Sequence, residues 1–175
     1  MIRHSHIRTD DIEVMQLYTK RMTDSDPLKG IRRHFEVCIE RHRGDVAKGT
    51  RGKWFEICCF DAFVKLGHQP VTHKYEPKQA ELDFWFAEQR IGVHAKTSVR
   101  ERWRQADRDA LVYRLGASGV QPKQQLLLIH KEQPGHTVRQ CVNKCRALEE
   151  KAVALDRVFS ACVPQHMEEL ELMLS

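Results

Sequence analysis

The sequence contains no long hydrophobic run, and this absence argues against a membrane-spanning helix. The longest aliphatic stretch is Leu126–Ile129, whereas a helix needs about 20 apolar residues to cross a bilayer. The opening residues, MIRHSHIRTDD, are charged and have no apolar segment of the kind found in secretory signal peptides. We therefore expect a cytoplasmic protein that is neither secreted nor inserted in a membrane.

The six cysteines lack the close pairs that many redox and metal motifs use. No C-x-x-C occurs, and the adjacent Cys58 and Cys59 suit a buried core better than a disulfide framework. Glycine-rich phosphate loops and dinucleotide-binding fingerprints are also missing, so we expect no nucleotide cofactor. A reducing cytoplasm is consistent with this cysteine usage.

Two cysteines later in the chain make a zinc site conceivable. Cys141 and Cys145 lie one helical turn apart, downstream of His130 and His136. Apolar residues at helical spacing surround both cysteines, however, and predict a stripe that faces the core. That stripe consists of Val138, Cys141, Val142, Cys145 and Leu148.

Glycine and proline are sparse, and the remaining composition is that of an ordinary globular protein. Hydrophobic residues make up 41% and charged residues 30% of the 175 residues, which suits a single domain over 1–175 with its own core. The net charge of +5 is modest support for a polyanionic partner. The basic residues gather in two segments, 29–53 and 90–114.

The hydrophobic periodicity predicts an α/β fold in which a mixed sheet is flanked by helices. Two helices, 11–22 and 27–42, form a helical N-terminal region over 1–48, and the glycines of 43–53 end this pattern. Proline at position 164 is expected to start the last helix. The other expected elements are helices at 54–66, 100–115 and 137–153, and strands at 71–75, 82–87, 90–98, 124–130 and 155–162.

The strands at 82–87 and 90–98 are expected to form a hairpin. A four-residue turn over 88–91 makes the numbers of paired residues add to about 179, which places Asp83 opposite Lys96 and Trp85 opposite His94. Leu82, Phe84 and Phe86 would then share the opposite, apolar face.

The predicted pairing of Asp83 and Lys96 has two interpretations. It is either a surface ion pair worth about 0–1 kcal/mol or part of a site that hydrolyses a phosphodiester. In the second interpretation, carboxylates hold Mg²⁺, which lowers the pKa of a bound water. The lysine then orients that water and stabilises the developing charge.

These residues resemble the motif of the PD-(D/E)XK nuclease superfamily, and within it the type II restriction endonucleases. Asp83 matches the first acid of the motif and Lys96 its lysine, while Leu82 replaces the expected proline and His94 replaces the second acid. The resemblance implies a restriction-endonuclease-like core over 49–175. His94 would be a spectator or would hydrogen-bond a ligand or water.

One branch of these enzymes carries the second acid on the following helix. The resemblance to that branch makes Asp109 the second metal ligand, with Asp107 as the reserve candidate, because the helical register decides which carboxylate faces the hairpin. Glu56 corresponds to a glutamate that many members place on the helix before the sheet. Asp83, Lys96, Asp109 and Glu56 would thus be catalytic, and the three acids would bind Mg²⁺.

The same branch reads adjacent G·C pairs with an Arg-acid-Arg triplet, which Arg100, Glu101 and Arg102 resemble. Arginine donates a bidentate pair to guanine and glutamate accepts from cytosine. Arg104 and Arg108 are interpreted as phosphate contacts, which position DNA without reading its sequence.

The resulting prediction is a Mg²⁺-dependent, sequence-specific endonuclease that cuts double-stranded DNA at a site with adjacent G·C pairs. A homodimer is expected, because cutting both strands of a palindrome requires two sites. Two alternatives stay open. One is a DNA-binding module that lost catalysis together with the acid at position 94, and the other is a structure-specific nuclease of the junction resolvase or repair type.

Overall fold

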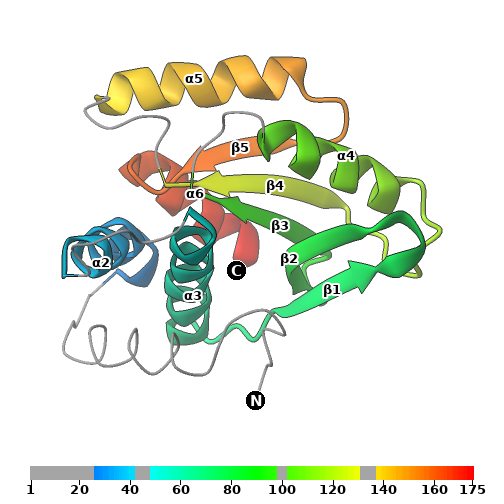
Figure 1. The fold of residues 1–175 in the computed structure, drawn as a ribbon, viewed down its shortest axis with the longest axis horizontal. Coiled ribbons are helices and arrows are strands. Elements are labelled where there is room, and N and C mark those ends of the chain that lie inside the picture. The colour runs from blue at the N-terminus through cyan, green and yellow to red at the C-terminus, as the bar shows by residue number, and fades with distance from the viewer. Residues whose placement is uncertain (1–25, 42–47, 98–101, 131–136) are drawn as a thin grey trace.

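The computed structural model describes residues 26–41, 48–97, 102–130 and 137–175. Its centre is one five-stranded mixed sheet in the order β1-β2-β3-β4-β5, shown in Figure 1. β1, β2 and β3 are antiparallel neighbours, whereas β3, β4 and β5 run parallel. The strands span Val71–Tyr75, Ala80–Phe86, Ile91–Lys96, Gln124–Ile129 and Arg157–Ser160. The predicted α/β fold with a mixed central sheet is confirmed.

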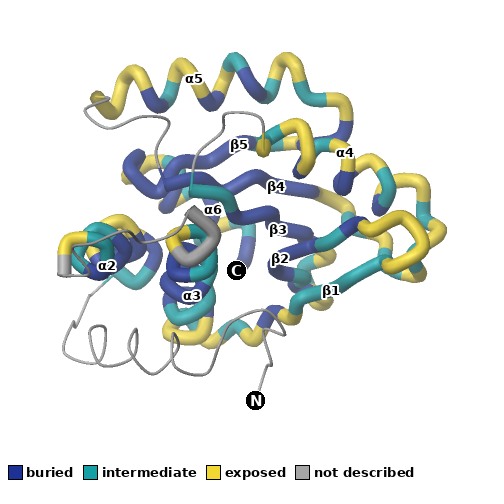
Figure 2. Tube along the Cα trace, viewed as in Figure 1, coloured by how far each residue is buried: buried dark blue, intermediate teal, exposed yellow. Residues whose placement is uncertain are grey.

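Helices cover both faces of this sheet. One hydrophobic cluster joins a face of the sheet to α2 (Pro27–Arg41), α3 (Lys48–Lys65) and α6 (Pro164–Leu174), and a second cluster joins the other face to α4 (Arg102–Arg114) and α5 (Val138–Lys151). A short 3-10 helix, η1 (Glu76–Lys78), separates β1 from β2. Figure 2 shows β3 and β4 buried, whereas buried and exposed positions alternate along α5. No described helix is long and apolar enough to cross a membrane.

The boundaries of most elements agree with the sequence periodicity, and α3 is the main exception. The glycine-containing segment 43–53 was expected to precede the helix, but α3 begins at Lys48 and includes Gly52. Glycine lowers helix stability by about 1 kcal/mol without preventing a helix, and the buried residues that follow hold α3 against the sheet. The predicted helix at 11–22 lies outside the described residues.

The β2–β3 hairpin has the predicted turn length at a different position. Phe86 pairs with Ile91 and Phe84 with Val93, so the four-residue turn spans 87–90 rather than 88–91. Arg90 ends it in the left-handed region, at φ 56°, and its guanidinium donates to the Gln121 carbonyl at 2.9 Å. The pairing is therefore displaced by two residues, and an even displacement keeps the side chains of the residues that pair there, 84–86 and 91–93, on their predicted faces.

A bulge in β2 changes the face of the residues that precede it. The register of β1 and β2 shifts between Val71 and His73, so that Thr72 lies opposite both Asp83 and Phe84. The Thr72 hydroxyl donates to the Asp83 carbonyl at 3.1 Å. Asp83 therefore sits where the regular alternation of the strand is interrupted.

The expectation that Leu82, Phe84 and Phe86 share one apolar face is consequently wrong. Leu82 packs with Ala80 and Tyr113, whereas Phe84 and Phe86 belong to the cluster beneath α3. The extra residue in β2 reverses the alternation between positions 82 and 84. The hydrophobic pattern alone gave no sign of it, because both faces of β2 are buried.

Candidate active site

Asp83 and Lys96 form the centre of the candidate site, at the end of the hairpin where β2 and β3 stop pairing. Lys96 Nζ lies 3.1 Å from Asp83 Oδ2, and the Ala95 amide donates to the same oxygen at 2.7 Å. The carboxylate thus replaces a ladder hydrogen bond and holds the two strand ends together. Asp83 is 6% exposed, so the interpretation as an exposed surface ion pair is wrong.

The charges around Lys96 keep its side chain protonated. Burial disfavours the ammonium, but the negative charges of Asp83 and Glu56 outweigh this effect and raise the pKa of Lys96. A cation fixed in a half-buried position can stabilise negative charge that develops beside it. Lys96 therefore has the protonation state that the hydrolytic interpretation requires.

Glu56 lies on α3, facing the Asp83–Lys96 pair. Burial, together with the negative charge of Asp83, raises the pKa of Glu56 to about 8. Two acidic groups in a poorly solvated site cannot both ionise without repulsion. A bound cation would remove that repulsion, and carboxylate oxygens are the ligands that Mg²⁺ prefers.

Asp109 and Asp107 both lie on α4, and their side chains make different contacts. Asp109 approaches the hairpin, where the Glu81 amide donates to its Oδ2 at 3.4 Å, and burial raises its pKa. Asp107 instead accepts hydrogen bonds from the amides of Val153, Ala154 and Leu155 at 2.8–3.1 Å. Of the two candidates, Asp109 is the one whose carboxylate faces the hairpin.

Glu81 is an acidic neighbour that the sequence did not single out. Burial and the negative charges of Asp83 and Asp109 raise the pKa of Glu81, whereas the positive charge of Lys96 has the opposite, smaller effect. The available signal was its position two residues before Asp83 on the same strand. The predicted strand began at Leu82, whereas β2 begins at Ala80, so Glu81 lay outside the strand in the prediction.

The acidic groups suit a hard cation by their chemistry, although they are not gathered around one point. Within the described residues, the ligand oxygens of Asp83, Asp109 and Glu56 do not all lie within 4.8 Å of one another. Binding a single ion through all three would require their side chains to rotate towards it. Asp83 and Glu56 interact with each other and with Lys96, which makes them the natural pair for such an ion.

His94, at the position of the missing acid, is buried with 1% of its surface exposed. Burial lowers the pKa of His94 to about 4, so its imidazole is neutral at physiological pH. Its Nε2 atom has no hydrogen-bond partner among the described residues. A neutral imidazole supplies a nitrogen where the nuclease motif has a carboxylate oxygen.

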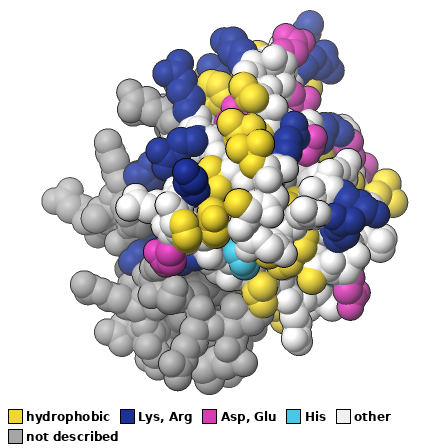
Figure 3. All heavy atoms as spheres, turned by 90° about the vertical axis from the view of Figure 1, so that its right-hand side faces the viewer, with side chains coloured by type: hydrophobic (Ala, Val, Ile, Leu, Met, Phe, Trp, Pro, Cys, Tyr) yellow, Lys and Arg dark blue, Asp and Glu magenta, His cyan; other side chains and the backbone are white. Residues whose placement is uncertain are grey.

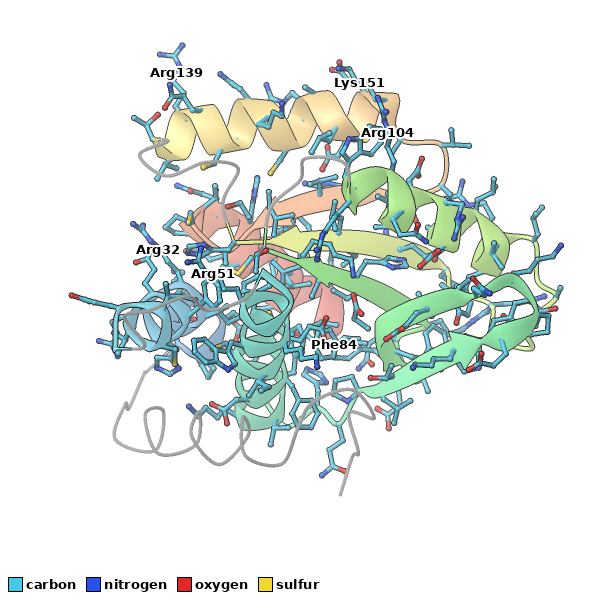
Figure 4. The ribbon with its side chains drawn as sticks, viewed as in Figure 1. Arg32, Arg51, Phe84, Arg104, Arg139 and Lys151 are labelled. Carbon is cyan, nitrogen blue, oxygen red and sulfur yellow. The ribbon has the colours of Figure 1, made fainter. Side chains whose placement is uncertain are left out.

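Three of the predicted DNA contacts, Arg102, Arg104 and Arg108, lie on α4. Arg102, Arg104 and Arg108 are exposed, and Arg108 Nε lies 3.9 Å from Asp109 Oδ1. Arg100 and Glu101, which complete the predicted base-reading triplet, lie outside the described residues. In Figure 4, labelled arginines come from both helical layers: Arg32 and Arg51 from α2 and α3, and Arg104 and Arg139 from α4 and α5.

No family model and no curated protein sequence matches the chain. A solved structure, that of the restriction endonuclease PspGI in complex with its substrate DNA, is similar with a TM-score of 0.56. The similarity covers 93% of this chain and 80% of that chain at 16% sequence identity. At this identity the likeness shows the fold alone, and the chain therefore has a restriction-endonuclease-like fold.

Proposed function

We propose that the protein is a Mg²⁺-dependent, sequence-specific endonuclease that cuts double-stranded DNA, of the type II restriction kind. The observation that carries the proposal is the ion pair between buried Asp83 and half-buried Lys96 at the open end of the hairpin. This pair lies in a restriction-endonuclease-like fold and has acidic groups on both sides. The complex of the similar protein PspGI with DNA supports DNA as the partner.

In this proposal, Asp83, Asp109 and Glu56 hold Mg²⁺, which would supply a water of lowered pKa and neutralise charge on the phosphate. Lys96 orients the attacking water and stabilises the negative charge that develops on phosphorus. Asp83 fixes the ammonium through its 3.1 Å contact. Glu56 carries a proton at neutral pH without a cation, and releases it when positive charge arrives.

The start of α4 would read the DNA sequence. Arg100, Glu101 and Arg102 are proposed to contact adjacent G·C pairs, because arginine matches guanine and glutamate matches the cytosine amino group. Arg104 and Arg108 would contact phosphates. A homodimer would place two such sites on a two-fold symmetric target.

Cleavage of a long DNA duplex tests the proposal. With Mg²⁺ the wild-type chain should yield discrete fragments, and Asp83→Ala and Lys96→Ala should each lower the rate by about 100-fold or more. The control variants are Asp61→Ala and Lys65→Ala, which break an ion pair of the same two residue types at the surface of α3. Wild-type protein that leaves every duplex intact would refute the proposal.

A DNA-binding module without catalysis is the second candidate, because the buried, neutral His94 stands at the position of an acid. Tight duplex binding without cleavage under any divalent cation would favour it. Cutting confined to branched or mismatched DNA would instead identify a structure-specific nuclease.

A further inference from the structure

A second group of polar side chains lies at the same edge of the sheet as Lys96. His130 directly follows β4, Cys162 lies just after β5, and Glu36 comes from α2. One ligand atom from each of these residues lies within 4.8 Å of the other two. His130 Nε2 is 3.3 Å from Glu36 Oε1. Three segments far apart in the sequence therefore bring an imidazole, a thiol and a carboxylate together.

We infer that Glu36, His130 and Cys162 bind a zinc ion. Nitrogen, sulfur and oxygen from these side chain types are the usual ligands of zinc, and a tetrahedral ion holds its ligand atoms about 3.3–3.8 Å apart. The observed spread is at most 4.8 Å, so small side-chain rotations suffice. The inference does not depend on the proposed nuclease activity, because thiolate and imidazole select zinc whereas the acids near Lys96 select Mg²⁺.

Hydrogen bonds connect the two backbone segments that carry His130 and Cys162. The Ser160 hydroxyl donates to the His130 carbonyl at 2.8 Å, and the Cys162 amide donates to the Ser160 hydroxyl oxygen at 3.2 Å. The ring of Phe35 packs edge-on against the imidazole, with centroids 4.8 Å apart. His130 and Cys162 are 7% and 6% exposed. A metal would thus meet ligands held in place by their surroundings.

The charge around the group also suits a metal. Arg32 Nε donates to Glu36 Oε1 at 3.1 Å. One thiolate and one carboxylate balance the two charges of zinc, and Arg32 can remain hydrogen-bonded to the carboxylate from outside.

Zinc at this position would join α2 to the ends of two parallel strands. Cys141 packs in the same small cluster as Cys162, whereas Cys145 belongs to the core beneath α5. The sequence suggested His130 and His136 with Cys141 and Cys145, but His136 lies outside the described residues, and His130 lies with Glu36 and Cys162 instead. Both helix cysteines are buried, as the hydrophobic stripe predicted.

The test measures metal binding to the full chain after chelation and dialysis. Zinc should bind with one ion per chain, and cobalt in its place should show the ultraviolet absorption band of a cobalt–thiolate bond. Cys162→Ser should remove that band, and Glu36→Gln should weaken zinc binding by about tenfold or more. Glu36 is half-exposed, so its variant is expected to fold even if the cysteine variant does not.

Two further variants separate this site from the rest of the molecule. Cys145→Ser alters a buried cysteine outside the group and should keep the cobalt–thiolate band. Asp83→Asn should also keep it, so that loss of nuclease activity and loss of zinc binding are distinguishable. The inference is overturned if the wild-type chain takes up no zinc, or if Glu36→Gln binds zinc as tightly as the wild type.

Discussion

At the scale of single residues, the environment of Glu56 has a measurable consequence. Its pKa rises from 4.5 to about 8 on folding, mainly through burial, so between these values the folded chain holds a proton that the unfolded chain lacks. The free energy of unfolding should therefore fall as the pH rises from about 4.5 to about 8. Glu56→Gln should remove this slope and, relative to wild type, stabilise the protein by about 1–3 kcal/mol at pH about 9.

Urea denaturation at a series of pH values, without divalent cations, measures this effect. Asp61→Asn provides the control, because it removes a carboxylate from the surface of the same helix and should keep the wild-type slope. If the free energy of unfolding of wild type and of Glu56→Gln depended on pH in the same way, the pKa of Glu56 would not be raised in the folded state.

Asp107 and Asp109 are expected to differ in what their loss does. Asp107→Asn replaces the charged acceptor of three backbone amides by a neutral amide with a single acceptor oxygen, and should lower the free energy of unfolding by about 1–3 kcal/mol. Asp109→Asn should lower the free energy of unfolding by less than about 1 kcal/mol and should abolish cleavage. Denaturation midpoints and cleavage rates of the two variants, measured side by side, check this assignment. If Asp107→Asn were as stable as the wild type but inactive, Asp107 rather than Asp109 would be the catalytic acid.

The sequence identified part of this site for a physical reason. Asp83 and Lys96 lie close together in the chain, on neighbouring strands of a hairpin, so the predicted hairpin alone could bring their side chains near each other. Glu81 was missed because the predicted strand began at Leu82, whereas β2 begins at Ala80. Cys162 was missed because it meets His130 and Glu36 through tertiary contacts, which no local spacing rule describes.

At the scale of elements, the hydrophobic periodicity predicted the order of helices and strands along the chain, while the details of strand pairing depended on backbone geometry. The turn length was predictable, but its position depends on Arg90 adopting a left-handed conformation and bonding to Gln121. Similarly, α3 starts earlier than expected because packing against the sheet outweighs the low helix propensity of Gly52.

Substitution by alanine should have opposite effects on stability at two glycines in these elements. A Cβ at Gly92 in β3 would lie 2.8 Å from Cδ2 of the buried Leu82, so Gly92→Ala should destabilise the protein by about 1–3 kcal/mol. At Gly52 in α3 no atom lies within 4 Å of the added carbon, and Gly52→Ala should stabilise by about 0.5–1 kcal/mol. Thermal unfolding of both variants tests this, and equal shifts would contradict the close contact at Gly92.

At the scale of the whole molecule, net charge does not locate a DNA-binding surface. The chain carries a charge of +5, but Figure 3 shows lysine and arginine side chains in separate groups around hydrophobic ones on one face of the protein. The parallel strands are more informative, because they end at one edge with Lys96, and α4 begins after that edge. DNA is therefore expected to approach the edge where β3 ends.

Duplex binding measured as a function of salt tests this orientation. Each phosphate contact contributes a slope of about −0.9 to the logarithm of the binding constant against that of salt concentration. Arg104→Gln at the start of α4 should make the slope shallower by about 0.9. Lys123→Gln removes the same charge from an exposed position before β4, at the opposite edge, and should leave the slope unchanged. If both variants made the slope shallower by the same amount, binding would depend only on the total charge of the protein. That result would contradict docking of the duplex at the carboxyl edge of the sheet.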